Sequence, residues 1–283
     1  MKYLVTGVKG QLGYDVVREL NQRFPNDIIK GIDIEDLDIT DSIAVEKFVD
    51  SFNPDIVFHN AAYTAVDNAE DNEELVNKVN VFGTQNLVEA CKNINAKIIF
   101  ISTDYVFDGT KEGYYDVDDI PNPLSTYGKS KMLAEELVKQ YDKHFIVRIS
   151  WAFGKNGNNF IKTMLRLSET RNEISVVVDQ VGSPTYTFDL ARLLVDLSQT
   201  EEYGIYHATN EGVCSWNEFA KKIFELTNKN ILVNEILSKD YKTKAIRPKN
   251  SKLSKNKLIE KGFKQLPNWE DALERYLKEI GVL

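Results

Sequence analysis

Tyr127 and Lys131 lie four residues apart in the segment Ser125–Lys131, so on a helix their side chains share one face. An ammonium group beside a phenol favours the phenolate. We therefore expect Lys131 to lower the pKa of Tyr127 from its ordinary value of about 10. A phenol tuned in this way can give a proton to a carbonyl oxygen near neutral pH. Because this spacing is common on surface helices, other residues must decide whether the pair carries chemistry.

Thr103 and Asp104 follow an apolar run, Lys97–Ser102, that is typical of a strand buried on both faces. A hydroxyl at the end of such a strand can share a substrate carbonyl oxygen with the Tyr127 phenol. Two hydroxyls then donate hydrogen bonds to this oxygen as negative charge develops on it, and the Lys131 ammonium lies next to them. Taken alone, the Thr103 hydroxyl would more simply satisfy a loop carbonyl.

A glycine-rich turn near the N-terminus predicts a dinucleotide site. The run Lys2–Thr6 has the composition of a short strand, and Gly7, Gly10 and Gly13 follow it at three-residue intervals before a helical pattern begins. Glycines at a strand–turn–helix junction let the backbone approach a pyrophosphate, which the positive end of the helix dipole attracts. The spacing Gly-x-x-Gly-x-x-Gly resembles that of the short-chain dehydrogenase/reductase superfamily.

The adenosine end of the cofactor site is predicted from Asp33, which ends a second apolar run, Ile28–Asp33. A carboxylate at this place can accept from the ribose hydroxyls and repels a 2′-phosphate, which favours NAD over NADP. The alternative is a turn residue at a strand end. A third run, Asp55–Ala62, ends in Ala61 and Ala62, whose small side chains let a cofactor pass close to the strand.

Strands and helices alternate along the first half of the chain. A long helical pattern, Glu73–Lys92, precedes the fourth strand, and a fifth strand, Phe145–Ser150, follows the Tyr127 helix. This alternation predicts a Rossmann-type, doubly wound parallel sheet with ligands at the carboxyl ends of its strands. Asn80, a polar residue inside the long helix, could support the active site. After Trp151 the pattern loosens, which predicts a smaller C-terminal α/β substrate domain.

Composition excludes several other classes of protein. The chain has 283 residues, a formal net charge of −8 and a pI of about 5.1, so it is a poor general binder of nucleic acid or anionic membrane. No apolar run is long enough to span a bilayer. The two cysteines, Cys91 and Cys214, and the three histidines have no metal-ligand spacing, and such cysteines fit a reducing cytoplasm.

Several segments together resemble the dTDP-4-dehydrorhamnose reductase family, which belongs to the extended branch of the short-chain reductases. The likeness covers nearly the whole chain, and the combined set is far more specific than any single motif. The segments are Ala61–Asp67, Ser102–Gly109, Tyr127–Lys131, Ser150–Trp151, Gly157–Phe160 and Asp179–Thr185.

The resemblance implies reduction of the ketone of dTDP-4-dehydro-β-L-rhamnose with NADH or NADPH, giving dTDP-β-L-rhamnose. Tyr127 matches the proton donor of the family, and Lys131 matches its partner, which also holds the nicotinamide ribose. We therefore expect residues 1–150, with 181–210 returning to them, to bind NAD(P), and residues 151–180 and 211–283 to bind the nucleotide sugar. The implied sugar contacts are Thr103, Asp104, Trp151 and Asn159, and the implied cofactor contacts are Gly10, Gln11, Leu12, Asp33, Asp38, Ile39, Ala62, Tyr63 and Thr64.

Charge is unevenly distributed, because Lys221–Lys264 contains thirteen Lys and Arg but four Asp and Glu. Arg247 in this segment is the best single candidate for holding a diphosphate, since a guanidinium suits phosphate oxygens. Most of the lysines would simply be solvated. Some members of the family bind magnesium and dimerise around it. Asp15 and Asp189 alone are weak evidence for such a site, so magnesium is possible but no metal is predicted. The chain is expected to be a monomer or a homodimer.

Two other functions remain open from the sequence. A nucleotide-sugar epimerase or dehydratase would share the fold and the cofactor, but dehydratases of this group place Asp-Glu after the strand-end Thr, and here Tyr105 follows Asp104. A non-catalytic NAD(P)-binding regulatory subunit is the second alternative. The intact set of Thr103, Tyr127 and Lys131 argues against it, because a pure binder has no need of these groups.

Overall fold

The computed structural model describes residues 1–283, and its centre is a six-stranded sheet whose neighbouring strands all run parallel. The strand order is β10-β5-β4-β3-β1-β2, so the winding reverses between β1 and β3. The predicted Rossmann-type sheet is therefore confirmed, and sheets of this kind bind ligands in the crevice at the reversal point. The strands are β1 (Lys2–Thr6), β2 (Ile28–Ile32), β3 (Ile56–His59), β4 (Lys97–Thr103), β5 (His144–Ile149) and β10 (Gly204–His207).

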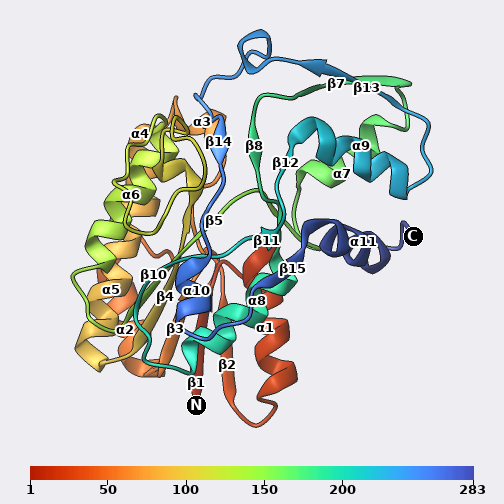
Figure 1. Ribbon diagram of the computed structural model, residues 1–283. Helices are drawn as coiled ribbons and strands as arrows, with labels where there is room; N and C mark the ends of the chain where they lie inside the picture. Colours follow the sequence, from red (N-terminus) through yellow and green to blue (C-terminus); the bar gives the residue numbers. More distant parts are fainter.

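Helices cover both faces of this sheet (Figure 1). Successive side chains of a strand point to opposite faces, so Tyr3 packs in one core with Leu190 of α8, and Leu4 packs in another with Leu87 of α5. The first face carries α1 and α8, and the second carries α2, α5 and α6. These helices are α1 (Gln11–Arg23), α8 (Thr187–Ser198), α2 (Ser42–Phe52), α5 (Gly83–Ile94) and α6 (Thr126–Val138).

The predicted long helix over Glu73–Lys92 is divided into three parts. Between α4 (Glu73–Asn77) and α5 lies the π-helical turn η1 (Lys78–Phe82), a type of irregularity that often occurs at functional sites. Asn80 lies in this turn and is buried. Its Oδ1 accepts from Tyr63 N at 2.7 Å, and its Nδ2 donates to Tyr63 O at 3.1 Å and to Ser130 Oγ at 2.9 Å. Asn80 thus fixes the loop after β3 against α6, as its polar character inside the pattern suggested.

A second lobe packs over the carboxyl ends of the sheet, and Figure 1 shows it on the side away from α2 and α5. Its core is rich in aromatic side chains, among them Phe153, Phe219 and Tyr276. Ser215 forms a capping box with Glu218 at the start of α9. The larger elements of this lobe are α7 (Phe160–Leu167), α9 (Trp216–Leu226), α11 (Trp269–Glu279) and the parallel strands β7 (Glu173–Val177) and β13 (Leu232–Ile236).

Short elements connect the two lobes. The predicted domain boundaries at residues 150, 180 and 210 stay a prediction, although α8 and β10, which both lie within 181–210, pack with the large sheet. The short elements are α3 (Val66–Ala69), η2 (Asp104–Val106), β6 (Ala152–Phe153), β8 (Val181–Gly182), β9 (Thr185–Tyr186), β11 (Asn210–Glu211), β12 (Cys214–Ser215), η3 (Ser238–Asp240), β14 (Asn250–Ser251), α10 (Asn256–Glu260) and β15 (Leu266–Asn268).

No helix has the length and apolar character that crossing a membrane requires.

Candidate active site

A cavity of about 720 Å³ opens at the carboxyl ends of β1, β3 and β4. This volume lies within the range of about 300–1,000 Å³ that small-molecule sites occupy. The predicted site residues lie on its walls, except for Asn159 and Arg247. Those that line it are Gly7, Gly10, Gln11, Leu12, Gly13, Asp33, Asp38, Ile39, Ala61, Ala62, Tyr63, Thr64, Thr103, Asp104, Tyr127, Lys131 and Trp151.

The turn between β1 and α1 fits a pyrophosphate. Gly7 has φ +69°, and a Cβ atom there would lie 2.9 Å from Ala61 N, so only glycine allows this close packing against the end of β3. Gly10 caps α1 without any side-chain hydrogen bond. The first N–H groups of the helix are therefore free to bind an anion, and the helix dipole favours one there.

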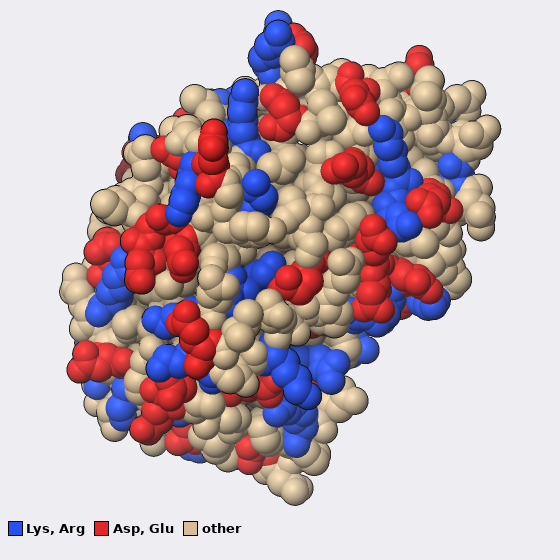
Figure 2. Space-filling view, viewed as in Figure 1, with Lys and Arg blue, Asp and Glu red and all other residues tan.

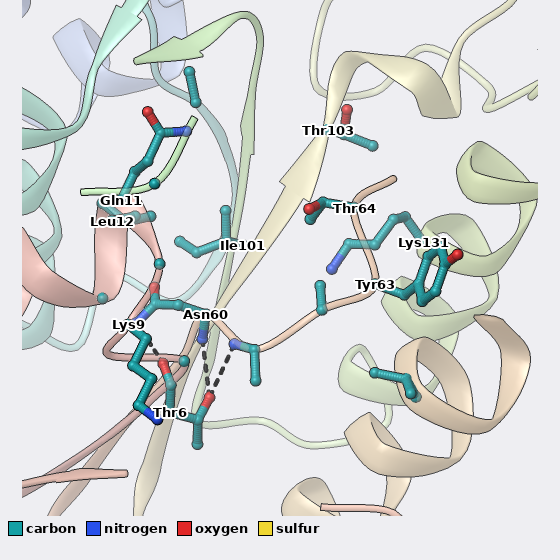
Figure 3. Close-up of a pocket in the computed structure, with 18 of the residues that line it drawn as sticks. Thr6, Lys9, Gln11, Leu12, Asn60, Tyr63, Thr64, Ile101, Thr103 and Lys131 are labelled. Carbon is teal, nitrogen blue, oxygen red and sulfur yellow. Dashed lines mark hydrogen bonds between the residues drawn. The ribbon is translucent and has the colours of Figure 1, made fainter. Parts of the chain in front are cut away.

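Thr6 and Asn60 shape the floor of the cavity, and the sequence analysis did not identify them. Thr6 Oγ1 accepts from Asn60 N at 3.1 Å and from Ala61 N at 3.0 Å (dashed lines in Figure 3). Asn60 Oδ1 is buried and has no partner within the chain. Because buried polar atoms are nearly always paired, this oxygen marks a place where a ligand can donate a hydrogen bond. The only sequence signal was position, since both residues sit at strand ends.

The end of the cavity beside β2 is rich in carboxylates. Asp33 follows β2, and its two oxygens accept from Lys9 N and Ile34 N, both at 2.9 Å. Lys9, which the sequence analysis missed, lines the same end and pairs its Nζ with Glu35 at 2.6 Å. Asp38 is held by Thr40 N, and this hydrogen bond lowers the pKa of its carboxyl group. The residues thus offer acceptors for ribose hydroxyls together with one cation.

Tyr127 and Lys131 lie on one face of α6, as their spacing predicts, but the expected effect on the pKa of Tyr127 is wrong. Burial, and after it the charge of Asp104, raises the pKa of Tyr127, while the Thr103 hydroxyl acts in the opposite direction. Lys131 Nζ lies 3.9 Å from the centroid of the Phe100 ring. Its own pKa falls to about 7 because burial disfavours the ammonium. Desolvation therefore outweighs the attraction between the two groups in this structure.

Thr103 and Asp104 form a buried hydrogen-bonded pair beside the phenol. Thr103 Oγ1 donates to Asp104 Oδ1 at 2.9 Å and accepts from Tyr105 N at 3.2 Å, and Ser251 Oγ donates to Asp104 Oδ2. Burial raises the pKa of Asp104 to about 6, and the two hydroxyl donors oppose this rise. The ring of Tyr105 packs edge-on against that of Tyr127 with centroids 5.6 Å apart. The Thr103 and Tyr127 hydroxyls therefore lie close together in surroundings from which water is largely excluded.

We expect Lys131→Met to be more stable than the unaltered protein at pH 6, and this difference to shrink by about 1.4 kcal/mol for each pH unit between 7 and 10. The pKa of Lys131 falls from 10.5 in the unfolded chain to about 7 in the fold. Below pH 7 the fold must bury the charged ammonium of Lys131. Between pH 7 and 10.5, Lys131 binds its proton in the unfolded chain but not in the folded protein. The free energy of unfolding therefore rises with pH over this range. Urea titrations from pH 6 to 10 should show the difference between the two proteins shrinking. A difference independent of pH would contradict the assigned pKa.

Trp151 forms part of the wall of the cavity. Its φ of +48° lies in the left-handed region, which is unusual for a bulky residue. The indole stacks on Trp216 of α9, with ring centroids 3.8 Å apart and planes 14° apart. This packing compensates for the unfavourable backbone conformation and holds the wall in place.

Two predicted ligands lie outside the cavity lining. Arg247 forms a two-point ion pair with Asp67, at 2.7 Å and 3.1 Å, and this engagement raises the pKa of its guanidinium against the effect of burial. A role for Arg247 in diphosphate binding stays a prediction, and it would require exchange of this partner. Asn159 is instead the N-cap of α7 and is hydrogen-bonded to Gln11.

The carboxylates weighed for magnesium have other partners. Asp15 accepts from Thr187 Oγ1 at 2.5 Å, and burial raises its pKa to about 6. Asp189 pairs with Arg275 at 2.6 Å. No group of three His, Cys, Asp or Glu side chains is arranged to hold a metal ion.

The basic segment Lys221–Lys264 is neutralised by carboxylates from other parts of the chain. On the face that Figure 2 shows, acidic and basic side chains are interspersed. On this face the basic side chains therefore do not form one continuous patch (Figure 2). Its ion pairs to other parts of the chain are Lys222–Glu270, Lys244–Asp71, Arg247–Asp67, Lys249–Asp179, Lys255–Glu211 and Lys261–Glu202.

Comparisons with known proteins find relatives over the whole chain. A family model described as RmlD substrate binding domain matches residues 1–282. A dTDP-4-dehydrorhamnose reductase of Aggregatibacter actinomycetemcomitans is 42% identical over 288 residues, which cover 96% of this chain and 97% of that protein. The crystal structure of a Clostridium acetobutylicum dTDP-4-dehydrorhamnose reductase is 40% identical, with a TM-score of 0.96 and 99% of each chain covered. A Bacillus anthracis dTDP-4-dehydrorhamnose reductase in complex with NADP is 44% identical, with a TM-score of 0.95 over 98% of this chain and 99% of that one.

Proposed function

This chain belongs to the dTDP-4-dehydrorhamnose reductase family, and from this membership we propose that it reduces the C4 ketone of dTDP-4-dehydro-β-L-rhamnose with NADH or NADPH. The observation that carries the proposal is a single cavity in which a dinucleotide turn and the Thr103, Tyr127 and Lys131 side chains face one another. Figure 3 shows Gln11 and Leu12 on one wall and Thr64 and Lys131 on the other.

The cofactor would be held along this cavity by the chain's own donors and acceptors. The turn from Gly7 to Gly13 takes the pyrophosphate at the N-terminus of α1, and Asp33 accepts from the adenosine ribose. Ala62 to Thr64 and Asn60 line the path toward Lys131. When bound, the cofactor supplies the hydride that the ketone carbon receives.

Tyr127 holds the proton that the reaction consumes. Its raised pKa keeps the phenol protonated near neutral pH, so Oη can donate to the oxygen of the reduced ketone as negative charge develops there. Lys131 lies one helical turn further along α6, and its charged form stabilises the tyrosinate that remains. Thr103 turns its hydroxyl hydrogen from Asp104 toward the ketone oxygen when the sugar binds.

The sugar nucleotide would lie between these donors and the Trp151 wall. Asp104 accepts hydrogen bonds from sugar hydroxyls, and the indole of Trp151 offers an apolar face to the sugar ring. Desolvation of this end strengthens each polar contact.

The proposal is tested by mixing the purified chain with enzymatically prepared dTDP-4-dehydro-β-L-rhamnose and NADH or NADPH. We expect absorbance at 340 nm to fall in proportion to the sugar added and dTDP-β-L-rhamnose to form. An epimerase would convert the sugar without net loss of reduced cofactor. A non-catalytic binding subunit would leave both unchanged. Either result would overturn the proposal. The cytoplasmic location and the monomeric or dimeric state expected from the sequence are separate predictions, which this assay does not test.

We propose that Asp33 favours NADH, and we expect Asp33→Ala to shift the ratio of kcat/KM toward NADPH by about tenfold. Loss of a charge-assisted hydrogen bond to the ribose weakens NADH binding, and loss of the negative charge relieves repulsion of a 2′-phosphate. Lys9 remains to pair with such a phosphate. Initial rates with both cofactors measure the ratio, and Asp50→Ala, which removes an exposed carboxylate of α2 outside the cavity lining, is the control. An unchanged ratio in Asp33→Ala would contradict this role.

A further inference from the structure

Gln11 connects the cofactor turn to the substrate lobe through its side-chain oxygen. Oε1 accepts from Gly154 N at 2.7 Å and from Asn159 Nδ2 at 3.0 Å. Gly154 and Asn159 belong to the loop after Trp151, whose residues Gly157 and Asn158 line the cavity. A side chain at position 154 could not fit, because its Cβ would lie 2.0 Å from Thr187 Oγ1. The loop therefore approaches Gln11 closely and at a fixed place.

The orientation of both amides follows from their partners. Asn159 caps α7, and the atom that meets Lys162 N at 3.0 Å must be its oxygen, because a backbone N–H can only donate. Asn159 Nδ2 therefore points the other way, toward Gly154 O, the Tyr276 hydroxyl and Gln11. Gln11 meets two donors, so it must present its oxygen to them.

This arrangement leaves the Gln11 Nε2 group as a donor without a partner in the chain. Gln11 is the first residue of α1 and lines the cavity at the pyrophosphate turn. In Figure 3 its amide nitrogen is turned to the side of Thr64 and Lys131, and its oxygen is turned away. One planar amide thus has its acceptor fixed on the substrate lobe and its donor free on the cofactor side.

We propose that Gln11 is a positioning residue that couples cofactor binding to the placement of the substrate loop over residues 151–159. A pyrophosphate oxygen that accepts from Nε2 fixes the amide plane and thereby strengthens the two hydrogen bonds that Oε1 accepts. The loop that carries Trp151 and Asn158 is then held in the position that binds the sugar nucleotide. By linkage, the sugar nucleotide tightens cofactor binding to the same extent.

The inference rests on the proposed function, and calorimetry without turnover tests it. The dissociation constant of dTDP is measured with and without saturating NAD⁺. We expect NAD⁺ to tighten dTDP binding about 5- to 20-fold in the unaltered protein, a factor typical of coupled sites. Binding of neither ligand would reject the proposed function and with it this inference. If both ligands bind but the cofactor leaves the dissociation constant of dTDP unchanged, this inference is overturned and the proposed function is not.

Three variants separate this role from a merely structural one. Asn159→Ser keeps a capping oxygen for α7 but removes the amide donor, and we expect it to reduce the coupling to less than about twofold. Gln11→Glu keeps an acceptor for Gly154 and Asn159 but replaces the free donor, so it should weaken NAD⁺ binding and also lose the coupling. Tyr276→Phe removes another partner of Asn159 and leaves the Gln11 contact, so the coupling should persist. Coupling retained in both Asn159→Ser and Gln11→Glu would overturn the proposal.

Discussion

The Tyr127→Phe variant is expected to bind NADPH about as tightly as the unaltered protein and to turn over about 10³-fold more slowly, an effect of the size that a general acid supplies. The substitution removes only the hydroxyl oxygen. The ring stays packed edge-on against Tyr105, and α6 keeps its cap from Ser125. The loss should therefore fall on kcat, because the reduced ketone oxygen no longer has a proton donor.

Tyr105→Phe provides the matched control for this experiment. Tyr105 is a second buried tyrosine on the wall of the same cavity, and burial raises its pKa as it does that of Tyr127. Its phenol has no role in the proton transfer, so its removal should change kcat less than about fivefold. Equal losses in the two variants, or near-normal turnover in Tyr127→Phe, would reject Tyr127 as the proton donor.

The largest effect on stability is expected from Glu135→Gln, which should lower the free energy of unfolding by about 3–5 kcal/mol. Glu135 follows Lys131 by one helical turn and is fully buried. Its carboxylate accepts from Arg148 Nε at 2.9 Å and from Arg148 Nη2 at 2.7 Å, and the Arg148 side chain is only 1% exposed. Removing one charge leaves the guanidinium in the core without a counter-ion. Urea unfolding at pH 7 measures the loss.

A double replacement tests whether the loss comes from the unpaired charge. Glu135→Leu combined with Arg148→Met removes both charges and fills the space with apolar atoms, so it should recover most of the stability lost in the single variant. Arg148 also donates to Val117 O at 3.2 Å, so a small loss should remain. If Glu135→Gln lowered the free energy of unfolding by less than about 1 kcal/mol, the stabilising role of the buried ion pair would be contradicted.

The parts of the fold that the sequence predicted are those with local signals. Apolar runs predicted the five strands from β1 to β5, and the glycine turn, Asp33 and Thr103 each lie at a strand end. In a parallel sheet these ends share one edge, so residues far apart in the chain meet at one cavity. The alternation of strands and helices predicted a parallel sheet but not its strand order. Most of the cavity lining follows from the edge that the strand ends share.

Contacts between the lobes and the depth of burial could not be predicted in the same way. The bond between Gln11 and Asn159 joins residues 148 positions apart, and neither residue has a local pattern that names its partner. The same holds for Arg247, whose partner Asp67 is 180 positions away. Spacing placed Tyr127 beside Lys131 on α6 but gave no measure of desolvation. The direction expected for the Tyr127 pKa was wrong because burial of the phenol, which spacing does not reveal, raises that pKa.

Transfer of deuterium from labelled cofactor tests the central claim most directly. The purified chain is incubated with dTDP-4-dehydro-β-L-rhamnose and NADPH that carries deuterium in the transferable position, and the sugar product is analysed by NMR. We expect dTDP-β-L-rhamnose with one deuterium at C4 of each sugar formed, and we expect Tyr127→Phe to form this product about 10³-fold more slowly. A product without deuterium at C4, or no product while both ligands bind, would contradict reduction of the ketone at this site.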